Sequence, residues 1–196
     1  MIFQRFSDLA VIILMITTFT ILLNENWRRN LFALSIQYFA MFWLTAIALP
    51  LGLAVVKLIV GWMVIAIIGA SQSPNAFQDS GLASRSGLIF RILTAGLVWL
   101  VVYSIVPAVQ RIIPTISQIT LGALVLAAMG ILQMGITTRP LRVIIGLLTT
   151  LSGFELVYAA VEPSSLGLGS LAVINLGLAM SAAYSLINPS RSEQTQ

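Results

Sequence analysis

Two ionisable side chains, Glu155 and Lys57, lie inside long apolar stretches of this sequence. Glu155 lies in segment 141–161, and Lys57, the only lysine in the chain, lies in segment 51–70. A charged group at membrane depth is costly, so it marks a functional-site hypothesis whose partner has to be identified. We expect the Glu155 carboxylate and the Lys57 ammonium to face each other or to share one hydrated cavity, as a buried ion pair or part of a proton or ion path.

The two charges are predicted to lie at a similar depth. Each is six residues from the end of its apolar segment, which corresponds to about 9 Å along a helix. Both ends belong to the same side, so the pair is expected in the outer half of the membrane. The alternative is that each charge is satisfied separately, with Lys57 extending to the lipid headgroups and Glu155 bonding Ser152 or Tyr158 on its own helix.

The composition indicates an integral membrane protein. Hydrophobic residues make up 59% of the chain and charged residues 8%, and the mean hydropathy is +1.02, far from the balance of a soluble domain. We therefore predict an all-α, polytopic helical bundle. The chain contains neither Cys nor His, which removes the usual ligands of haem, iron–sulfur clusters and zinc. We expect no cofactor and no metal site.

About seven apolar segments have roughly the length that crosses a bilayer, which is about 20 residues. A tight hairpin around Pro50 is expected to separate the second segment from the third. Together the segments form one transmembrane domain, 1–190, and residues 188–196 form a polar tail. The predicted spans are 8–23, 31–49, 51–70, 88–106, 115–136, 141–161 and 166–187.

The arginines predict the orientation, because cytoplasmic ends of spans carry the excess of basic residues. Only Arg5 and Arg111 fall on the other side of a seven-span arrangement. The N-terminus is therefore expected outside and the C-terminus in the cytoplasm. A cleaved signal peptide is disfavoured, because the basic pair follows the first apolar segment. The arginines on the cytoplasmic side are Arg28, Arg29, Arg85, Arg91, Arg139, Arg142 and Arg191.

Other polar residues within the spans are candidates for contacts between helices. Small residues recur in the later spans and would let helices approach closely, as in a compact bundle or against partner subunits. The polar residues are Gln37, Gln133, Ser152, Tyr158 and Asn175.

The expected partners are membrane lipids and other membrane subunits. The basic residues stand singly or in pairs at span edges, which is typical of topology signals and not of a nucleic-acid surface. The polar connection 71–87 is either a solvated linker or a docking surface for a peripheral cytoplasmic subunit. Signatures of an ordinary active site are missing, because the sequence has no Ser–His pairing, phosphate loop or closely spaced carboxylates. Catalysis by the chain itself is not expected, and ion handling stays open.

One stretch resembles a family of membrane subunits. Residues 138–155, TRPLRVIIGLLTTLSGFE, resemble the second helix of the K-type subunit of complex I and its relatives. These relatives are the C-type subunit of multisubunit cation antiporters and component E of hydrogenase-4. Residues 29–37, RNLFALSIQ, and Lys57 are similar to the N-terminal half of the hydrogenase component. The resemblance covers nearly the whole chain with short apolar motifs, and the predicted seven spans with an outer N-terminus are compatible with the hydrogenase component.

The chain departs from that pattern at its acids. The K-type pattern has a glutamate where this chain has Leu148, and the hydrogenase pattern would have one near Leu151. Here the acid is Glu155, one or two helical turns further along roughly the same face. The last span offers Asn175 where K-type subunits carry a second acid. These departures favour an accessory role over a complete two-carboxylate relay.

The sequence thus predicts a non-catalytic subunit of a complex-I-like, membrane-bound hydrogenase-like or cation-antiporter-like assembly. Such an assembly would lie in a prokaryotic plasma membrane or an equivalent energy-transducing membrane. The open alternatives are a stand-alone small transporter and a structural or assembly protein of the membrane.

Overall fold

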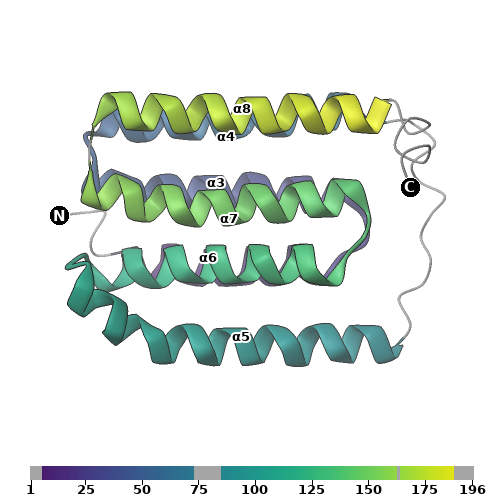
Figure 1. Ribbon diagram of the computed structural model, residues 1–196, viewed down its shortest axis with the longest axis horizontal. Helices are drawn as coiled ribbons and strands as arrows, with labels where there is room; N and C mark the ends of the chain where they lie inside the picture. Colours follow the sequence, from purple (N-terminus) through teal and green to yellow (C-terminus); the bar gives the residue numbers. More distant parts are fainter. Residues whose placement is uncertain (1–5, 73–84, 163, 188–196) are drawn as a thin grey trace.

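The computed structural model describes residues 6–72, 85–162 and 164–187, and these residues form seven helices and no strand. The predicted all-α bundle is confirmed (Figure 1). Six helices are long and apolar enough to span a membrane, whereas α2, with 17 residues, is shorter. Most of connection 71–87 and the tail 188–196 lie outside the described residues. The helices are α2 (Ser7–Leu23), α3 (Trp27–Ala48), α4 (Leu51–Ala70), α5 (Arg85–Ile112), α6 (Ser117–Ile136), α7 (Pro140–Val161) and α8 (Ser165–Ile187).

Two helices are longer than the apolar segments that predicted them. Helix α3 begins at Trp27 because the side chain of Asn26 caps it, accepting a hydrogen bond of 3.0 Å from the backbone N–H of Arg28. Side chains of this type satisfy the free amides of a first turn. Helix α5 continues to Ile112 and bends near its C-terminal end (Figure 1). Pro107 lies inside that part of the helix, and a proline removes one helical hydrogen bond and bends the axis.

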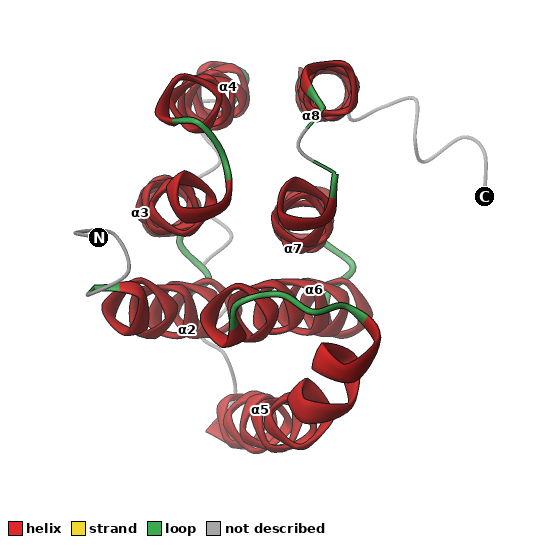
Figure 2. Ribbon diagram, turned by 90° about the vertical axis from the view of Figure 1, so that its left-hand side faces the viewer, coloured by secondary structure: helices red, strands yellow, loops and turns green. Residues whose placement is uncertain are grey.

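The helices form two rows that lie side by side (Figure 2). The first row contains α2, α3 and α4, and the second contains α6, α7 and α8. Contacts between the rows join α2 to α6, α3 to α7 and α4 to α8, while α5 packs outside against α6 and α2. Because every helix reverses direction, matching helices of the two rows run parallel. The protein is therefore built from two similar three-helix units joined by α5.

The central helices of the two rows also match in sequence. Helices α3 and α7 each contain 22 residues. Their third residue is an arginine, and their seventh and fourteenth residues are small. The matching pairs are Arg29 and Arg142, Ala33 and Gly146, and Ala40 and Gly153.

The two rows are stacked in the same orientation, so equivalent faces of the two rows point the same way and do not face each other. Thr149 and Ser152 of α7 are buried against the first row, but Ile36 and Phe39, at the matching positions of α3, are 37% and 43% exposed. The face of α7 that packs inward thus corresponds to a face of α3 that points out of the bundle. One unit covers the next, and the corresponding face of the first unit stays uncovered by the described residues.

Close packing within the second row depends on glycine. A Cβ atom added to Gly130 would lie 2.6 Å from the carbonyl oxygen of Gly146, and one added to Gly153 would lie 2.5 Å from that of Ala123. Helices α6 and α7 approach closely because these side chains are missing. Gly169 and Gly177 of α8 differ from the expectation, because no atom lies within 4 Å of a Cβ built there. Small residues therefore tighten the α6–α7 interface and not the outer face of α8.

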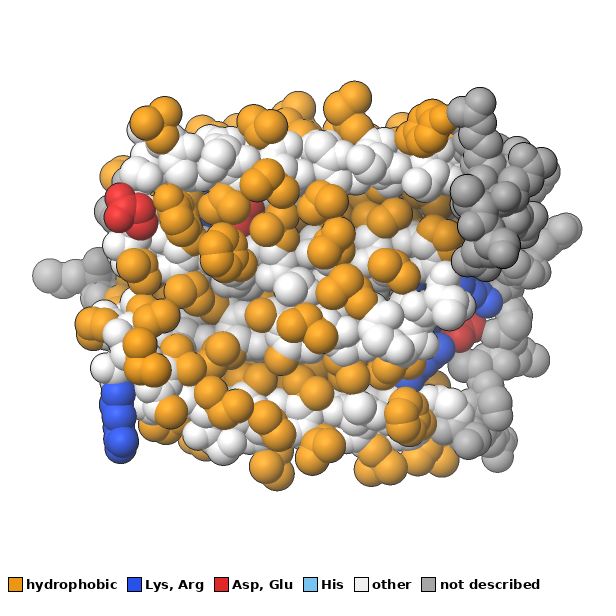
Figure 3. Space-filling view, viewed as in Figure 1, with side chains coloured by type: hydrophobic (Ala, Val, Ile, Leu, Met, Phe, Trp, Pro, Cys, Tyr) orange, Lys and Arg blue, Asp and Glu red, His pale blue; other side chains and the backbone are white. Residues whose placement is uncertain are grey.

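Charged side chains gather at the two ends of the bundle, and hydrophobic side chains cover the surface between them (Figure 3). We call the end where α3 and α7 begin the basic end. Arg28, Arg29, Arg91, Arg139 and Arg142 lie there, and α5 begins there with Arg85, whereas Arg111 lies at the opposite end. This asymmetry agrees with the seven-span count. Which end faces the cytoplasm stays a prediction.

Candidate functional site

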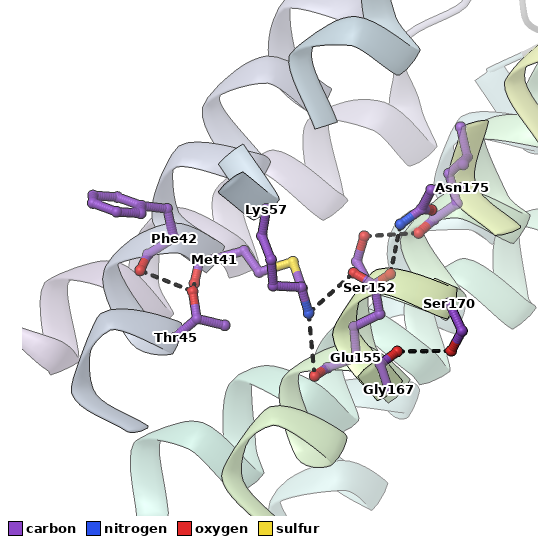
Figure 4. Close-up of polar contacts among 10 residues, drawn as sticks. Met41, Phe42, Thr45, Lys57, Ser152, Glu155, Gly167, Ser170 and Asn175 are labelled. Carbon is purple, nitrogen blue, oxygen red and sulfur yellow. Dashed lines mark hydrogen bonds and ion pairs between the residues drawn. The ribbon is translucent and has the colours of Figure 1, made fainter. Parts of the chain in front are cut away.

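The structure brings Lys57 and Glu155 together (Figure 4). The Nζ atom of Lys57 lies 3.4 Å from Oε2 of Glu155 and 3.5 Å from the Glu155 carbonyl oxygen. Glu155 is 2% exposed, and the Lys57 side chain is 11% exposed. The two charges therefore form an ion pair between spanning helices, shielded from both ends of the bundle.

Asn175 of α8 completes the site. Its Nδ2 atom donates a hydrogen bond of 2.5 Å to Oε1 of Glu155, so both carboxylate oxygens have a partner. The other amide atom, Oδ1, is buried and has no hydrogen-bond partner among the described residues. The site thus joins α4 of the first row to α7 and α8 of the second.

Helical spacing points the two charges into the bundle. Glu155 shares a face of α7 with the buried residues Ser152 and Ala159, which are three and four positions away. Lys57 lies on the face of α4 that also carries the buried Ala54 and Gly61. Gly61 lets α3 approach this face of α4, because a Cβ atom added there would lie 2.5 Å from the Tyr38 ring.

The alternative in which each charge is satisfied separately is not what the structure shows. The Ser152 hydroxyl donates to the Leu148 carbonyl at 2.8 Å, and the Tyr158 ring packs on Gly167 and stacks on Phe154 with 6.2 Å between ring centroids. Neither side chain bonds Glu155 in the described part of the chain. Lys57 points to α7 and not along its own helix toward the headgroups.

A pocket lies over the ion pair, between α4 and α8. Its volume is ≈ 100 Å³, and Lys57, Glu155 and Asn175 contribute its polar groups among apolar residues such as Val56 and Leu168. One water molecule needs about 10–15 Å³ measured in this way. The pocket therefore has room for several water molecules beside the carboxylate, as the expected hydrated cavity requires.

Buried polar groups continue from Glu155 along α7. Arg142, Thr149, Ser152 and Glu155 are all buried, and they cover about 20 Å of the helix axis. We call these four residues the polar face of α7. Gln37 of α3 donates to the Thr149 hydroxyl at 3.4 Å, so the first row contributes to this face.

The polar face ends at the basic end of the bundle. The Nη2 atom of Arg142 donates to the Leu22 carbonyl at 2.7 Å, and Gln133 of α6 donates to the Arg142 carbonyl at 2.9 Å. An ion pair between Arg91 and Glu25, 3.4 Å long, lies at the same end. Buried polar side chains thus occur at intervals between the ion-pair site and this end, and among the described residues no side-chain hydrogen bond joins Arg142 to Thr149 or Ser152 to Glu155.

Two further polar atoms are unpartnered near the middle of this face. The Gln37 Oε1 atom and the Tyr38 hydroxyl are buried without a hydrogen-bond partner among the described residues. The Tyr38 hydroxyl lies close to Ser152 and within electrostatic range of Glu155. Buried polar groups are normally satisfied by protein or water. Small shifts or ordered water would connect Thr149, Tyr38 and Ser152 to the carboxylate.

The predicted polar contacts have different outcomes. Gln37, Gln133 and Asn175 bond across helix interfaces, whereas Ser152 bonds its own helix and Tyr158 lies against Gly167. Sequence reasoning treated Arg142 only as a topology signal, but the structure buries it. Its seven-residue spacing from the buried Thr149 places the two side chains on one helix face, and this pattern could have revealed it.

The donor set of the site is one carboxylate, one amide and one ammonium group. Within the described ranges, no group of three or more His, Cys, Asp or Glu side chains is close enough to hold a metal ion. The arrangement is suited to holding, exchanging or relaying a proton or a monovalent cation at one carboxylate. No protein-family model, curated protein or solved structure matches this chain.

Proposed function

We propose that this protein is a non-catalytic integral membrane subunit of a complex-I-like, hydrogenase-like or cation-antiporter-like assembly, and that Glu155 and Lys57 form part of its proton path. The assembly would lie in a prokaryotic plasma membrane or an equivalent energy-transducing membrane. The observation that carries the proposal is the ion pair of 3.4 Å buried between α4 and α7. Ionisable pairs at membrane depth are typical of proton relays in pumps and transporters.

The pair can couple a proton to a change in packing. A charged Lys57 close to the Glu155 carboxylate favours its ionised form, because opposite charges attract. When the two side chains separate, burial favours the protonated carboxyl group. Proton uptake and release would then follow the opening and closing of the α4–α7 contact. The polar face of α7 supplies a route between this group and the basic end.

Asn175 supports an accessory role in such an assembly. It occupies the region of the last span where the resembling K-type subunits carry a second acid, and it donates to Glu155. An amide can hold the carboxylate in place but cannot take a proton from it under ordinary conditions. One titrating carboxylate in this site suits a coupling element better than a complete relay.

The experiment that tests subunit membership is purification from native membranes in a mild detergent. The full chain would carry an affinity tag, and co-eluting proteins would be identified by mass spectrometry. We expect hydrophobic subunits with antiporter-like sequences in stoichiometric amounts. A chain that migrates alone, with no such subunits in the membrane extract, contradicts the proposal.

A charge swap tests whether the pair itself is functional. Lys57→Glu and Glu155→Lys each place two like charges together and are expected to abolish proton-coupled activity of the assembly. The double variant restores one positive and one negative charge at the same depth and should recover activity. Recovery requires coupling between the two sites. Full activity of either single variant would show that the pair is structural only.

A stand-alone small transporter is the second candidate, and the two-row architecture favours it. Parallel repeats occur in small transporters, whose binding sites lie at the interface between repeats. Lys57 and Glu155 come from different rows, so this site lies at such an interface. Proteoliposomes that contain only the purified chain would show proton or cation flux, and Glu155→Gln would abolish it. Absence of flux, together with co-purifying subunits, favours the first candidate.

A further inference from the structure

The pocket over the ion pair extends beyond the three polar side chains of the site, and we call it the α4–α8 pocket. Its lining follows two parallel helices, from Leu53 to Val60 on α4 and from Ser165 to Asn175 on α8. Both helices begin at the end opposite the basic end (Figure 1), and Leu53 and Ser165 lie in their first turns. Ser165 and Asn175 are ten positions apart, which is about 15 Å along a helix. The pocket therefore runs from the helix ends to the depth of the ion pair.

The inner end of the pocket has hydrogen-bonding groups to spare. Asn175 lines the pocket and is 3% exposed, and its Oδ1 atom has no hydrogen-bond partner among the described residues. The Lys57 ammonium group carries three N–H donors, and its two contacts with Glu155 are long, at 3.4 and 3.5 Å. Buried amide oxygens are normally satisfied by protein or by ordered water. The inner end thus offers both an acceptor and a donor to water.

The wall of the pocket is thin on the outer edge of the two rows, where α4 and α8 lie (Figure 2). Val56 is 53% exposed, and a Cβ atom built on the exposed Gly169 has no atom within 4 Å. Glu155 itself is 2% exposed, whereas the Lys57 side chain is 11% exposed. The pocket therefore reaches the ion pair along the edge of the bundle and not through its centre.

The other side of Glu155, toward the basic end, is arranged differently. The Ser152 hydroxyl donates to the Leu148 carbonyl at 2.8 Å and not to Glu155. Among the described residues, no side-chain hydrogen bond joins Arg142 to Thr149 either. In this conformation the polar groups on the basic side are satisfied within helices, while space for water adjoins the carboxylate on the opposite side.

We propose that water enters the α4–α8 pocket from the end opposite the basic end and reaches Glu155, so that the carboxylate exchanges protons with that end. The volume of ≈ 100 Å³ corresponds to about 7–10 water molecules. A single file over about 15 Å needs about five, at the usual spacing of about 2.8 Å between oxygens. This inference deepens the proposed proton path and rests on it for its role in transport, because it assigns the side from which protons arrive.

Thiol accessibility tests the proposal, since the chain contains no cysteine and any introduced thiol is the only one. Silver ion is a small water-borne probe that binds thiolates, and a thiol in an apolar surrounding stays protonated. Ala172→Cys and Val60→Cys place thiols in the pocket lining. Val173→Cys and Ile59→Cys are matched controls, because these neighbours lie at the same depth, outside the lining, and are 70% and 52% exposed.

The full chain in membrane vesicles is treated with silver nitrate in chloride-free buffer. Thiols that remain are then counted with a fluorescent maleimide after denaturation. We expect each pocket thiol to be blocked at least about tenfold faster than its matched neighbour, because only the pocket thiols meet water at that depth. Equal rates within both pairs overturn the proposal.

The side of entry is tested in vesicles of either orientation. Arg111→Cys marks the end opposite the basic end, and Arg139→Cys marks the basic end, since both arginines are exposed. External silver should block the Ala172→Cys thiol in the orientation in which it blocks Arg111→Cys. Reaction from the basic end, alone or equally with the other end, overturns the proposed side of entry.

Filling the pocket provides a second test with a matched control. Gly169→Leu adds a side chain to the pocket lining, and Gly177→Leu adds the same side chain to α8 outside the lining. A Cβ atom meets no atom within 4 Å at either position, so both variants should fold. In a Val60→Cys background, Gly169→Leu should slow the silver reaction at least about fivefold, because it narrows the passage for water, and Gly177→Leu should leave it unchanged. Equal effects of the two leucines contradict a defined passage.

These measurements separate this inference from the proposed function, because thiol accessibility needs no proton-coupled activity. If the pocket thiols are no more reactive than their neighbours while Glu155→Gln abolishes proton-coupled activity, the access route fails and the proton path stands. If the pocket thiols react as expected while Glu155→Gln keeps full activity, water reaches the carboxylate and the proposed function fails.

Discussion

Helices α3 and α7 occupy matching places in their rows, yet their polar residues face opposite environments. Both contain 22 residues and both have arginine as the third. Arg142 is buried and donates a hydrogen bond to the Leu22 carbonyl at the end of α2, whereas Arg29 is exposed in the first turn of α3. The sixteenth residue is Glu155 in α7 and the apolar Phe42 in α3.

The difference shows that the stacking of the two rows, and not the sequence of a helix alone, decides which helix face can hold buried polar or charged side chains. The inner face of α7 is covered by the first row, so its polar groups find partners on α2, α3, α4 and α8. The matching face of α3 has no row to cover it in the described structure, and it carries Ile36 and Phe39 toward the lipid. A polar side chain there would have no protein partner in hydrocarbon.

The largest expected effect on stability comes from breaking the Lys57–Glu155 ion pair, which involves α7 and has no counterpart on α3. Lys57→Met leaves the Glu155 carboxylate buried without its counter-ion and should lower the free energy of unfolding by about 3–5 kcal/mol. Lys57→Met with Glu155→Leu should recover most of that loss, because both charges are gone. Equilibrium unfolding in mixed micelles measures both, with Phe42→Leu as a mild control on α3. A stable single variant would mean that the ion pair does not form.

The next largest effect on stability is expected at the two matching arginines, Arg142 and Arg29. Arg142→Gln loses a charge-assisted bond to the Leu22 carbonyl and should cost about 1.5–3 kcal/mol of stability. Arg29→Gln changes an exposed side chain, and the change in stability should stay within about 0.5 kcal/mol. Equilibrium unfolding of the two variants side by side shows whether the rows are as different as the structure indicates. Equal losses of stability in the two variants would contradict the finding that Arg142 is buried and Arg29 is not.

The small residues at the fourteenth position sharpen the comparison of packing. Gly153→Ala places a Cβ atom 2.5 Å from the Ala123 carbonyl oxygen, so it should force α6 and α7 apart and cost about 1–3 kcal/mol. The α3 counterpart, Ala40, already carries this atom, and Ala40→Gly should cost only about 1 kcal/mol through helix propensity. Thermal unfolding of both variants tests the difference. A stabilising Gly153→Ala would show that the close approach of α6 and α7 is not required.

The smallest effect is expected where the rows share a weak polar contact. The Gln37 to Thr149 bond is long, at 3.4 Å, and hydrogen bonds between spanning helices average about 0.6 kcal/mol. A double-mutant cycle of Gln37→Met and Thr149→Val should give a coupling energy of that size. Proton-coupled activity of the native assembly should fall more than stability does if this contact belongs to the path. A loss of stability without loss of activity would leave it as packing only.

Much of the fold could be predicted because hydropathy sets span length and arginines mark span ends. The seven helices follow from the apolar segments, and the clustering of Arg28, Arg29, Arg91, Arg139 and Arg142 at one end follows from the span count. The extra turn at the start of α3 was missed, since Arg28, Arg29 and Asn30 are polar but helical. The resemblance to K-type and component E subunits and the orientation stay predictions.

The pairing of Lys57 with Glu155 could be proposed from depth, but the third partner could not. Asn175 was one of several polar residues within spans, and nothing in its spacing connects it to Glu155. The role of Arg142 was also hidden, because an arginine at a span end is ordinarily a topology signal. Both depend on which helices become neighbours, and contacts between distant segments leave no local pattern.

By itself the sequence determined that the chain is a membrane bundle, how many helices it has and which helix ends are basic. It also determined that two charged residues, Lys57 and Glu155, lie deep inside apolar segments. These properties are local, since the bilayer imposes a length and a polarity on each segment separately. Only the tertiary structure decided that two three-helix rows stack in the same sense. That stacking buries the polar face of α7, places Asn175 against Glu155 and leaves Ile36 and Phe39 of α3 exposed. The physical reason is that lipid satisfies every apolar face equally well, so close packing and polar partners select the neighbours.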